Sequence, residues 1–125
     1  MPSFDRGERA SGPVVQAVGA RGFTVDGGIY RGLLLTPERA DGWEPPALAA
    51  LTVSDFEPLF GLQPGPEFIL LGTGPSLVFP PRALVRALEE RGVGVEAMDS
   101  RAAARTWGVL RAEERWIAAA LMPLD

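Results

Sequence analysis

The stretch from residue 67 to residue 98 reads EFILLGTGPSLVFPPRALVRALEERGVGVEAM, and it decides the fold class. A compact apolar run at 67–71 predicts a strand, and Pro80-Pro81 begins a helix because the fixed φ of proline suits a first helical turn. Gly92 ends this helix, and a second strand follows at 93–98. A strand, a helix and a strand in this order predict a right-handed crossover between parallel strands.

The C-terminal third continues this alternation. Ser100 can cap a second helix, and Gly108 lies inside its pattern, where it can end or bend the helix. The run 116–122 is continuously apolar, which is typical of a strand that is covered on both faces and central in its sheet. The residues expected to face the core from the two helices are Leu84, Val85, Leu88, Ala103, Trp107 and Leu110.

The N-terminal third carries a hairpin signal. Asp26-Gly27 lies between two β-rich runs, and both residues suit the positive φ angles of a tight hairpin turn. We therefore expect strands near 13–19, 21–26 and 28–35.

A polar, proline-bearing segment follows. Residues 38–46 are expected to form a loop anchored by Trp43, and residues 47–51 a short edge strand. Ser54 and Glu57 have the spacing of a capping box, which predicts a short helix over 54–60.

The order of these elements predicts an α/β domain, in its α+β variant, with a mixed sheet. A chain of 125 residues is enough for one domain with a real hydrophobic core. We place this single domain at 13–125, after a loose N-terminal arm at 1–12.

The composition excludes many catalytic chemistries. The sequence has no His, no Cys and no Lys, and all twelve basic residues are Arg. Catalytic triads, cysteine nucleophiles, zinc sites of the usual ligands and Schiff bases are therefore excluded. We expect no catalytic residues, no cofactor and no metal.

Charge and hydropathy restrict partners and location. The net charge of −4 argues against nucleic-acid binding, which usually needs a clustered basic face. No apolar run is long enough to span a bilayer, and the first twelve residues lack the apolar core of a signal peptide. The expected location is the cytoplasm.

One candidate pocket lies at the expected edge of the sheet. The carboxyl ends of parallel strands meet at one edge, where open α/β sheets bind ligands. A dinucleotide site fits poorly, because Leu77 stands at the third glycine position of that motif. The alternative is that Asp99 and Ser100 only cap a helix. The candidate pocket residues are Gly72, Thr73, Gly74, Ser76, Asp99, Ser100 and Arg105.

A second candidate is an interaction surface. Apolar side chains crowd a helix that is too short to bury all of them, beside a tryptophan in a polar loop, and exposed apolar patches usually mark contact sites. Packing of the same residues as a satellite core is the alternative. The candidate surface residues are Trp43, Phe56, Leu59 and Phe60.

Several short motifs together resemble one domain family, over about residues 14–123. They are GFTVDG at 22–27, LLLxP at 33–37, Trp43, GTG at 72–74, GVGVE at 92–96, Asp99 and AAALMP at 118–123. The chain is similar to the family that includes mitochondrial respiratory complex I assembly factor 3 and the adipogenesis-associated domain protein.

The resemblance implies a three-layer fold around a mixed, roughly five-stranded sheet, with an N-terminal hairpin and two main helices. It also implies an interaction or assembly-factor-like module that binds another protein, without established enzymatic activity. Ala104, Trp107 and Gly108 stand where relatives carry Cys, an aromatic residue and Asn, so no role of that thiol or amide is transferred. The alternative function is a small-molecule-binding protein or weak enzyme that uses the edge at Gly72–Gly74 and Asp99.

Overall fold

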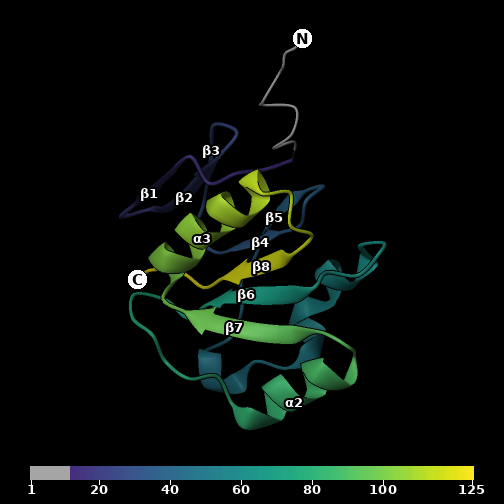
Figure 1. The fold of residues 1–125 in the computed structure, drawn as a ribbon. Coiled ribbons are helices and arrows are strands. Elements are labelled where there is room, and N and C mark those ends of the chain that lie inside the picture. Colours follow the sequence, from purple (N-terminus) through teal and green to yellow (C-terminus); the bar gives the residue numbers. More distant parts are fainter. Residues whose placement is uncertain (1–11) are drawn as a thin grey trace.

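The structure is a computed structural model that describes residues 12–125. Apart from Gly12, the expected arm at 1–12 lies outside the described residues. Two sheets and the helices around them form a layered α/β domain (Figure 1).

The N-terminal sheet is an antiparallel meander. Its strands are β1 (Ala17–Gly19), β2 (Gly22–Val25) and β3 (Gly28–Tyr30), in the order β1-β2-β3. Asp26 and Gly27 have φ angles of 51° and 84°, so the predicted hairpin turn is confirmed.

The predicted strand at 28–35 is wrong in one respect, because it is two strands in two sheets. The chain leaves the meander after Tyr30, and β4 (Leu33–Leu35) joins the larger sheet. At the break, a Cβ on Gly32 would lie 2.4 Å from the carbonyl oxygen of Trp43, so only glycine fits. All three leucines of β4 are buried, as the two covered faces of a central strand require.

The larger sheet has five strands in the order β5-β4-β8-β6-β7. The strands not yet given are β5 (Ala40–Gly42), β6 (Phe68–Gly72), β7 (Gly94–Met98) and β8 (Ala118–Leu121). β6 runs parallel to β7 and β8, whereas β4 runs antiparallel to β8 and β5. The predicted mixed sheet, the parallel crossover and the central place of the C-terminal strand are confirmed.

The predicted edge strand at residues 47–51 is wrong. Residues 47–51 form no strand but a 3₁₀ helix, η1 (Leu48–Ala50), and the edge strand β5 lies inside the segment expected to be a loop. The hydroxyl of Thr36 accepts hydrogen bonds from the backbone N–H groups of Glu38 and Arg39, both at 3.1 Å. This turn folds the chain back so that β5 pairs with β4.

The predicted short helix is a 3₁₀ helix, η2 (Val53–Gly61). Pro58 lies inside it and has no N–H to donate, which disfavours the α-helical pattern. The capping box consists of Thr52 and Asp55 rather than Ser54 and Glu57, and the Thr52 N–H donates to the Asp55 carboxylate at 2.9 Å.

The two α-helices are α2 (Arg82–Glu90) and α3 (Ser100–Ala112). Gly92 has a φ of 83° after α2, as a helix stop requires, and α3 continues through Gly108. The expected inward residues of both helices are buried or, for Val85 and Leu110, half-buried.

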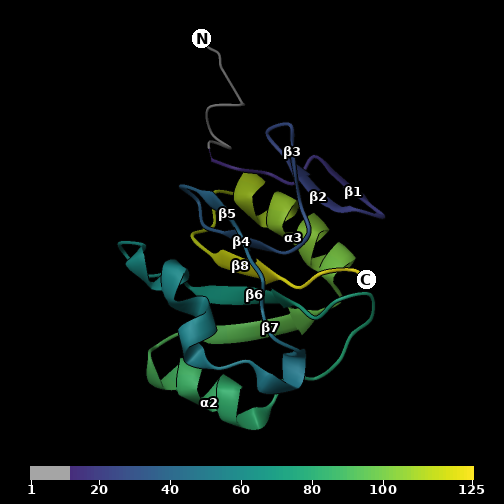
Figure 2. The same ribbon diagram turned by 180° about the vertical axis from the view of Figure 1, so that it is seen from behind.

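The helices cover opposite faces of the larger sheet. α2 and η2 pack on one face, and α3 packs on the other beside the N-terminal sheet (Figures 1 and 2). Along β6, Ile69 and Leu71 face the first layer and Leu70 faces the second. The second layer is tied to the N-terminal segment by the Trp107 indole N–H, which donates to the Pro13 carbonyl at 2.9 Å. The three-layer arrangement is thereby confirmed.

One buried hydroxyl joins three segments at the carboxyl ends of β6, β7 and β8. Ser100 Oγ accepts the N–H of Gly74 at 2.9 Å and donates to the Met122 carbonyl at 2.8 Å. Ser100 is fully buried. A Cβ on Gly72 would lie 2.7 Å from the same Oγ, so this approach requires glycine.

We expect Ser100→Ala to lower the free energy of unfolding by roughly 2–6 kcal/mol, because it leaves the Gly74 N–H and the Met122 carbonyl without this partner, and each unpaired group costs about 1–3 kcal/mol. Urea denaturation followed by circular dichroism measures the change. Ser76→Ala, at an exposed position, is the control and should stay within about 0.5 kcal/mol of the wild type. Equal stability of the two variants would contradict the role of this hydroxyl.

Candidate functional site

The structure brings most of the predicted pocket residues together. Gly72 is in register with Met98 of β7 and with Leu121 of β8, so the carboxyl ends of these strands share one edge. The other residues that meet there are Thr73, Gly74, Ser76, Asp99 and Ser100.

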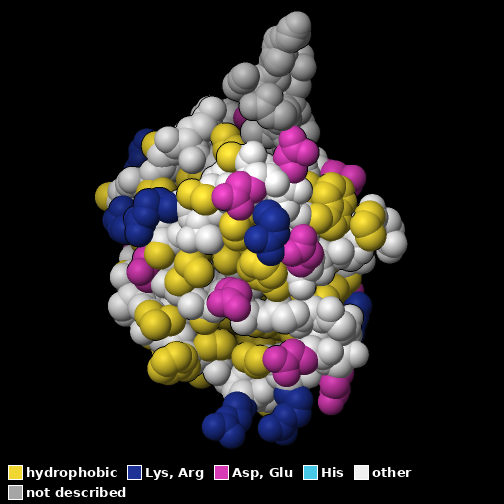
Figure 3. All heavy atoms as spheres, viewed as in Figure 1, with side chains coloured by type: hydrophobic (Ala, Val, Ile, Leu, Met, Phe, Trp, Pro, Cys, Tyr) yellow, Lys and Arg dark blue, Asp and Glu magenta, His cyan; other side chains and the backbone are white. Residues whose placement is uncertain are grey.

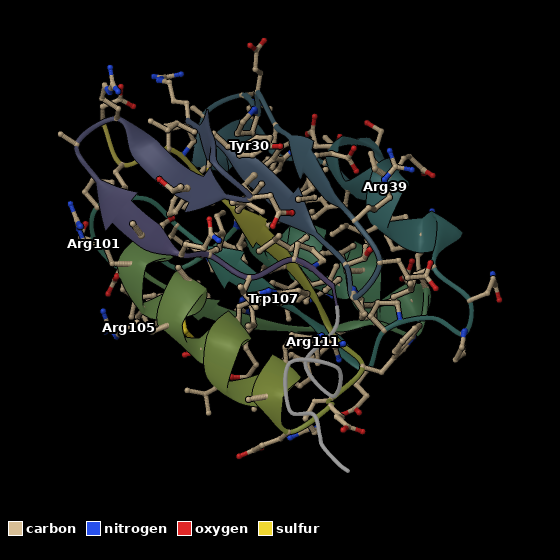
Figure 4. The ribbon with its side chains drawn as sticks, turned by 90° about the horizontal axis from the view of Figure 1, so that it is seen from above. Tyr30, Arg39, Arg101, Arg105, Trp107 and Arg111 are labelled. Atoms are coloured by element: carbon tan, nitrogen blue, oxygen red, sulfur yellow. The ribbon has the colours of Figure 1, made fainter. Side chains whose placement is uncertain are left out.

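Arg105 does not join this group, and its placement in the pocket is wrong. It lies on the exposed side of α3, where Figure 4 shows Arg101 and Arg105 pointing away from the sheet. The two arginines are four residues apart, so they occupy the same helix face. Since Ala103 and Trp107 face the core, this arginine face has to be turned to solvent.

The polar side chains at the edge bind the protein's own backbone. Thr73 Oγ1 donates to the Ser76 carbonyl at 2.7 Å and accepts the N–H of Val78 at 3.1 Å. Ser100 Oγ is occupied by the backbone of Gly74 and Met122. These hydroxyls therefore order the loop and the strand ends.

Asp99 is the N-cap of α3. Its Oδ1 accepts the N–H of Ala102 at 2.8 Å, and its φ and ψ of −63° and 160° are extended. The capping alternative thus describes Asp99. Ser100 is the first residue of the helix rather than its cap.

We expect Asp99→Ala to lower the free energy of unfolding by about 0.5–2 kcal/mol, the usual cost of removing an N-cap. Asp99→Ser keeps a capping oxygen and should recover most of that loss. Chemical denaturation of both variants measures the difference. An Asp99→Ala variant more stable than the wild type would instead indicate that the carboxylate is retained for binding.

A shallow groove of about 310 Å³ lies beside this edge, and Thr73 and Gly74 contribute to its wall. Arg31 and Asp125 form an ion pair at 2.9 Å on the same wall. The hydrogen bond from Arg31 lowers the pKa of Asp125, so the carboxylate and the guanidinium are both charged and paired at neutral pH. The groove is otherwise lined largely by proline and other apolar residues.

The second candidate, an exposed surface around Trp43, is wrong for its main residues. Phe56 and Leu59 are fully buried, and only 8% of Trp43 is exposed. The Trp43 indole N–H donates to the Asp55 carbonyl at 3.0 Å, and its ring lies 5.6 Å from that of Phe56. Phe60 is half-buried beneath the guanidinium of Arg91. η2 packs with α2 on one face of the sheet, so its apolar side belongs to the core.

We expect Trp43→Ser to lower the free energy of unfolding by about 3 kcal/mol or more, because it empties a buried aromatic site. Phe60→Ser should cost less, since part of that ring is already in water. Guanidinium denaturation followed by circular dichroism compares the variants. A loss for Trp43→Ser below that for Phe60→Ser would contradict this assignment.

A different segment exposes large apolar side chains, and sequence reasoning missed it. Leu77, Val78 and Phe79, here termed the apolar loop, are 51%, 48% and 83% exposed between β6 and α2. Figure 3 shows hydrophobic side chains gathered over this connection at the lower left. The sequence signal that could have indicated it is an apolar triplet between Pro75 and Pro80. These prolines separate the triplet from the strand before it and the helix after it, which indicates a loop.

Residues 12–125 contain neither a cluster of potential metal ligands nor a helix suited to crossing a membrane. No three acidic side chains lie close enough together there to hold a metal ion. None of the helices in this range has the length and apolar character needed to cross a bilayer.

The fold and this edge define a class of small three-layer α/β domain. In it, hydroxyls at the strand ends form hydrogen bonds with the protein's own backbone, and the apolar loop is exposed to solvent. A family model described as "Protein of unknown function (DUF498/DUF598)" matches residues 15–122, and the chain belongs to this family.

Two relatives and one solved structure show what this chain is similar to. The chain is 28% identical over 117 residues to "NADH dehydrogenase [ubiquinone] 1 alpha subcomplex assembly factor 3" of Danio rerio, covering 93% of this chain and 67% of that protein. It is 33% identical over 103 residues to an uncharacterized protein of Rhodobacter capsulatus, covering 82% and 77%. The crystal structure of a Bordetella parapertussis protein matches with a TM-score of 0.80 and 36% identity, covering 90% and 97%.

The chain spans only 60–67% of the length of the assembly-factor relatives it matches.

Proposed function

We propose that this protein is a protein-interaction module that helps a larger protein complex to assemble. The assembly-factor names of several relatives support this class of function. The proposal includes the cytoplasmic location expected from the sequence. It places no catalytic step in the chain.

The observation that carries the proposal is the apolar loop. Phe79 is 83% exposed, although burial of a phenylalanine side chain stabilises a fold by about 1.5–3 kcal/mol. The loop is nevertheless ordered, because Thr73 binds the backbone of Ser76 and Val78. An apolar surface that is both exposed and held in shape suits contact with another protein.

The hydrogen-bond partners at the strand ends favour this function over a small-molecule site at the same edge. The hydroxyls of Thr73 and Ser100 and the carboxylate of Asp99 already bind backbone groups of the protein itself. A ligand that used them would first have to break these hydrogen bonds, and leaving their backbone partners unpaired is costly.

We expect Leu77→Ser and Phe79→Ser each to lower the recovery of native partners by about tenfold or more, the loss of roughly 1.4 kcal/mol or more of binding free energy. Tagged protein is purified from its native cell, and the proteins that copurify are quantified by mass spectrometry. Both variants should stay close to the stability of the wild type, because half or more of each removed side chain is in water.

Val109→Ser is the matched control. Val109 is 58% exposed on α3, outside the apolar loop, so this change should leave partner recovery unaltered. If the loop variants recover the same proteins in the same amounts as Val109→Ser, the loop is not a contact site and the proposal fails.

A further inference from the structure

The strand β7 forms one outer edge of the larger sheet. It stands last in the strand order, and no strand among residues 12–125 pairs with its outer side. The N–H of Thr73 donates to the carbonyl of Met98 at 2.8 Å, so the backbone of Met98 points inward to β6. Since alternate residues of a strand point their N–H and C=O groups to opposite sides, Val95 and Ala97 point theirs outward.

This edge lacks three of the devices that block further pairing, and α2 packs beside β7. Edge strands are commonly protected by proline, lysine or a β-bulge. β7 contains neither residue, and its five residues pair with β6 in continuous register, without a bulge. Glu96 is the one charged residue of the strand, and its side chain is exposed.

The apolar loop lies next to the carboxyl end of this edge. Thr73 Oγ1 accepts the N–H of Val78 and is 3.3 Å from the carbonyl oxygen of Met98, so one hydroxyl joins the loop to the end of β7. Both ribbon views show the connection from β6 to α2 passing the end of β7 (Figures 1 and 2). A chain paired with β7 would therefore reach the apolar loop.

The charge of the edge selects its occupant. Glu96 forms no ion pair within the described part of the chain. If a second copy paired antiparallel about the centre of β7, Glu96 would lie opposite its own counterpart, and like charges directly opposite are destabilising. An arginine or lysine on a different chain would instead pair with Glu96.

We propose that β7 accepts an extended segment of a partner protein as a sixth strand, with a basic side chain opposite Glu96 and apolar side chains against the apolar loop. The inference rests on the proposed function and names the form of its partner. The outward N–H and C=O groups of Val95 and Ala97 give four backbone hydrogen bonds to the segment. The side chain of Glu96 provides selectivity for a basic residue.

The test uses displayed random peptides of about twelve residues as the probe, selected on the whole protein. The selected peptides should carry an arginine or lysine between β-branched or aromatic residues. Selection on Glu96→Arg should instead enrich aspartate or glutamate. Glu96 is exposed, so this variant should fold as the wild type does.

Ala97→Pro removes an outward N–H without removing a hydrogen bond to β6, as proline at an edge strand allows. It should weaken binding of the selected peptides by about tenfold or more. Ala97→Ser keeps the N–H and is the matched control, with wild-type affinity expected. Amide hydrogen exchange should show Val95 and Ala97 becoming protected when the peptide binds.

Three results would overturn the inference. The first is that Ala97→Pro and Ala97→Ser bind the selected peptides equally well. The second is that the peptides selected on the wild type and on Glu96→Arg show no charge preference. The third is that the protein sediments as a dimer that Ala97→Pro dissociates, because then a second copy occupies the edge. When one of these results is found and the Phe79→Ser variant still loses its native partners, the proposed function stands while this inference falls. If Phe79→Ser also retains them, both fall.

Discussion

The hydroxyl of Ser100 is the interaction on which the rest of the structure depends. It binds the backbone just after two parallel strands, at Gly74 after β6 and at Met122 after β8, and Ser100 begins α3. Its close approach excludes any side chain at Gly72. The direction of α3, the ends of β6 and β8 and the start of the loop that follows β6 are therefore set together at one buried point.

This constraint explains why the edge resembles a ligand site although Thr73, Asp99 and Ser100 bind the protein's own backbone. Glycines, hydroxyls and an aspartate at the carboxyl ends of parallel strands are the residues that nucleotide-binding folds use. Here Thr73 shapes a loop, Asp99 caps a helix and Ser100 joins strands. Residue types alone do not separate these roles, because the partners of the hydroxyls lie up to 26 residues away in the sequence.

Local signals predicted much of the fold. The Asp26-Gly27 turn, the helix behind Pro80-Pro81 and the central apolar strand each depend on residues within one element. The split at Gly32 and the burial of Trp43 depend instead on segments that meet only in the folded chain. The edge was predictable from the parallel crossover, whereas the apolar loop was missed because exposure is set by the whole fold and not by a motif.

The N-terminal sheet is joined to the larger sheet by side chains, since no strand of one pairs with a strand of the other among the described residues. Trp107 lies at this junction, fully buried and hydrogen-bonded to Pro13. Its indole is therefore an optical reporter built into the domain. Fluorescence of a chain in which Trp107 is the sole tryptophan would shift to longer wavelength when the N-terminal sheet separates, even while the five-stranded sheet remains intact.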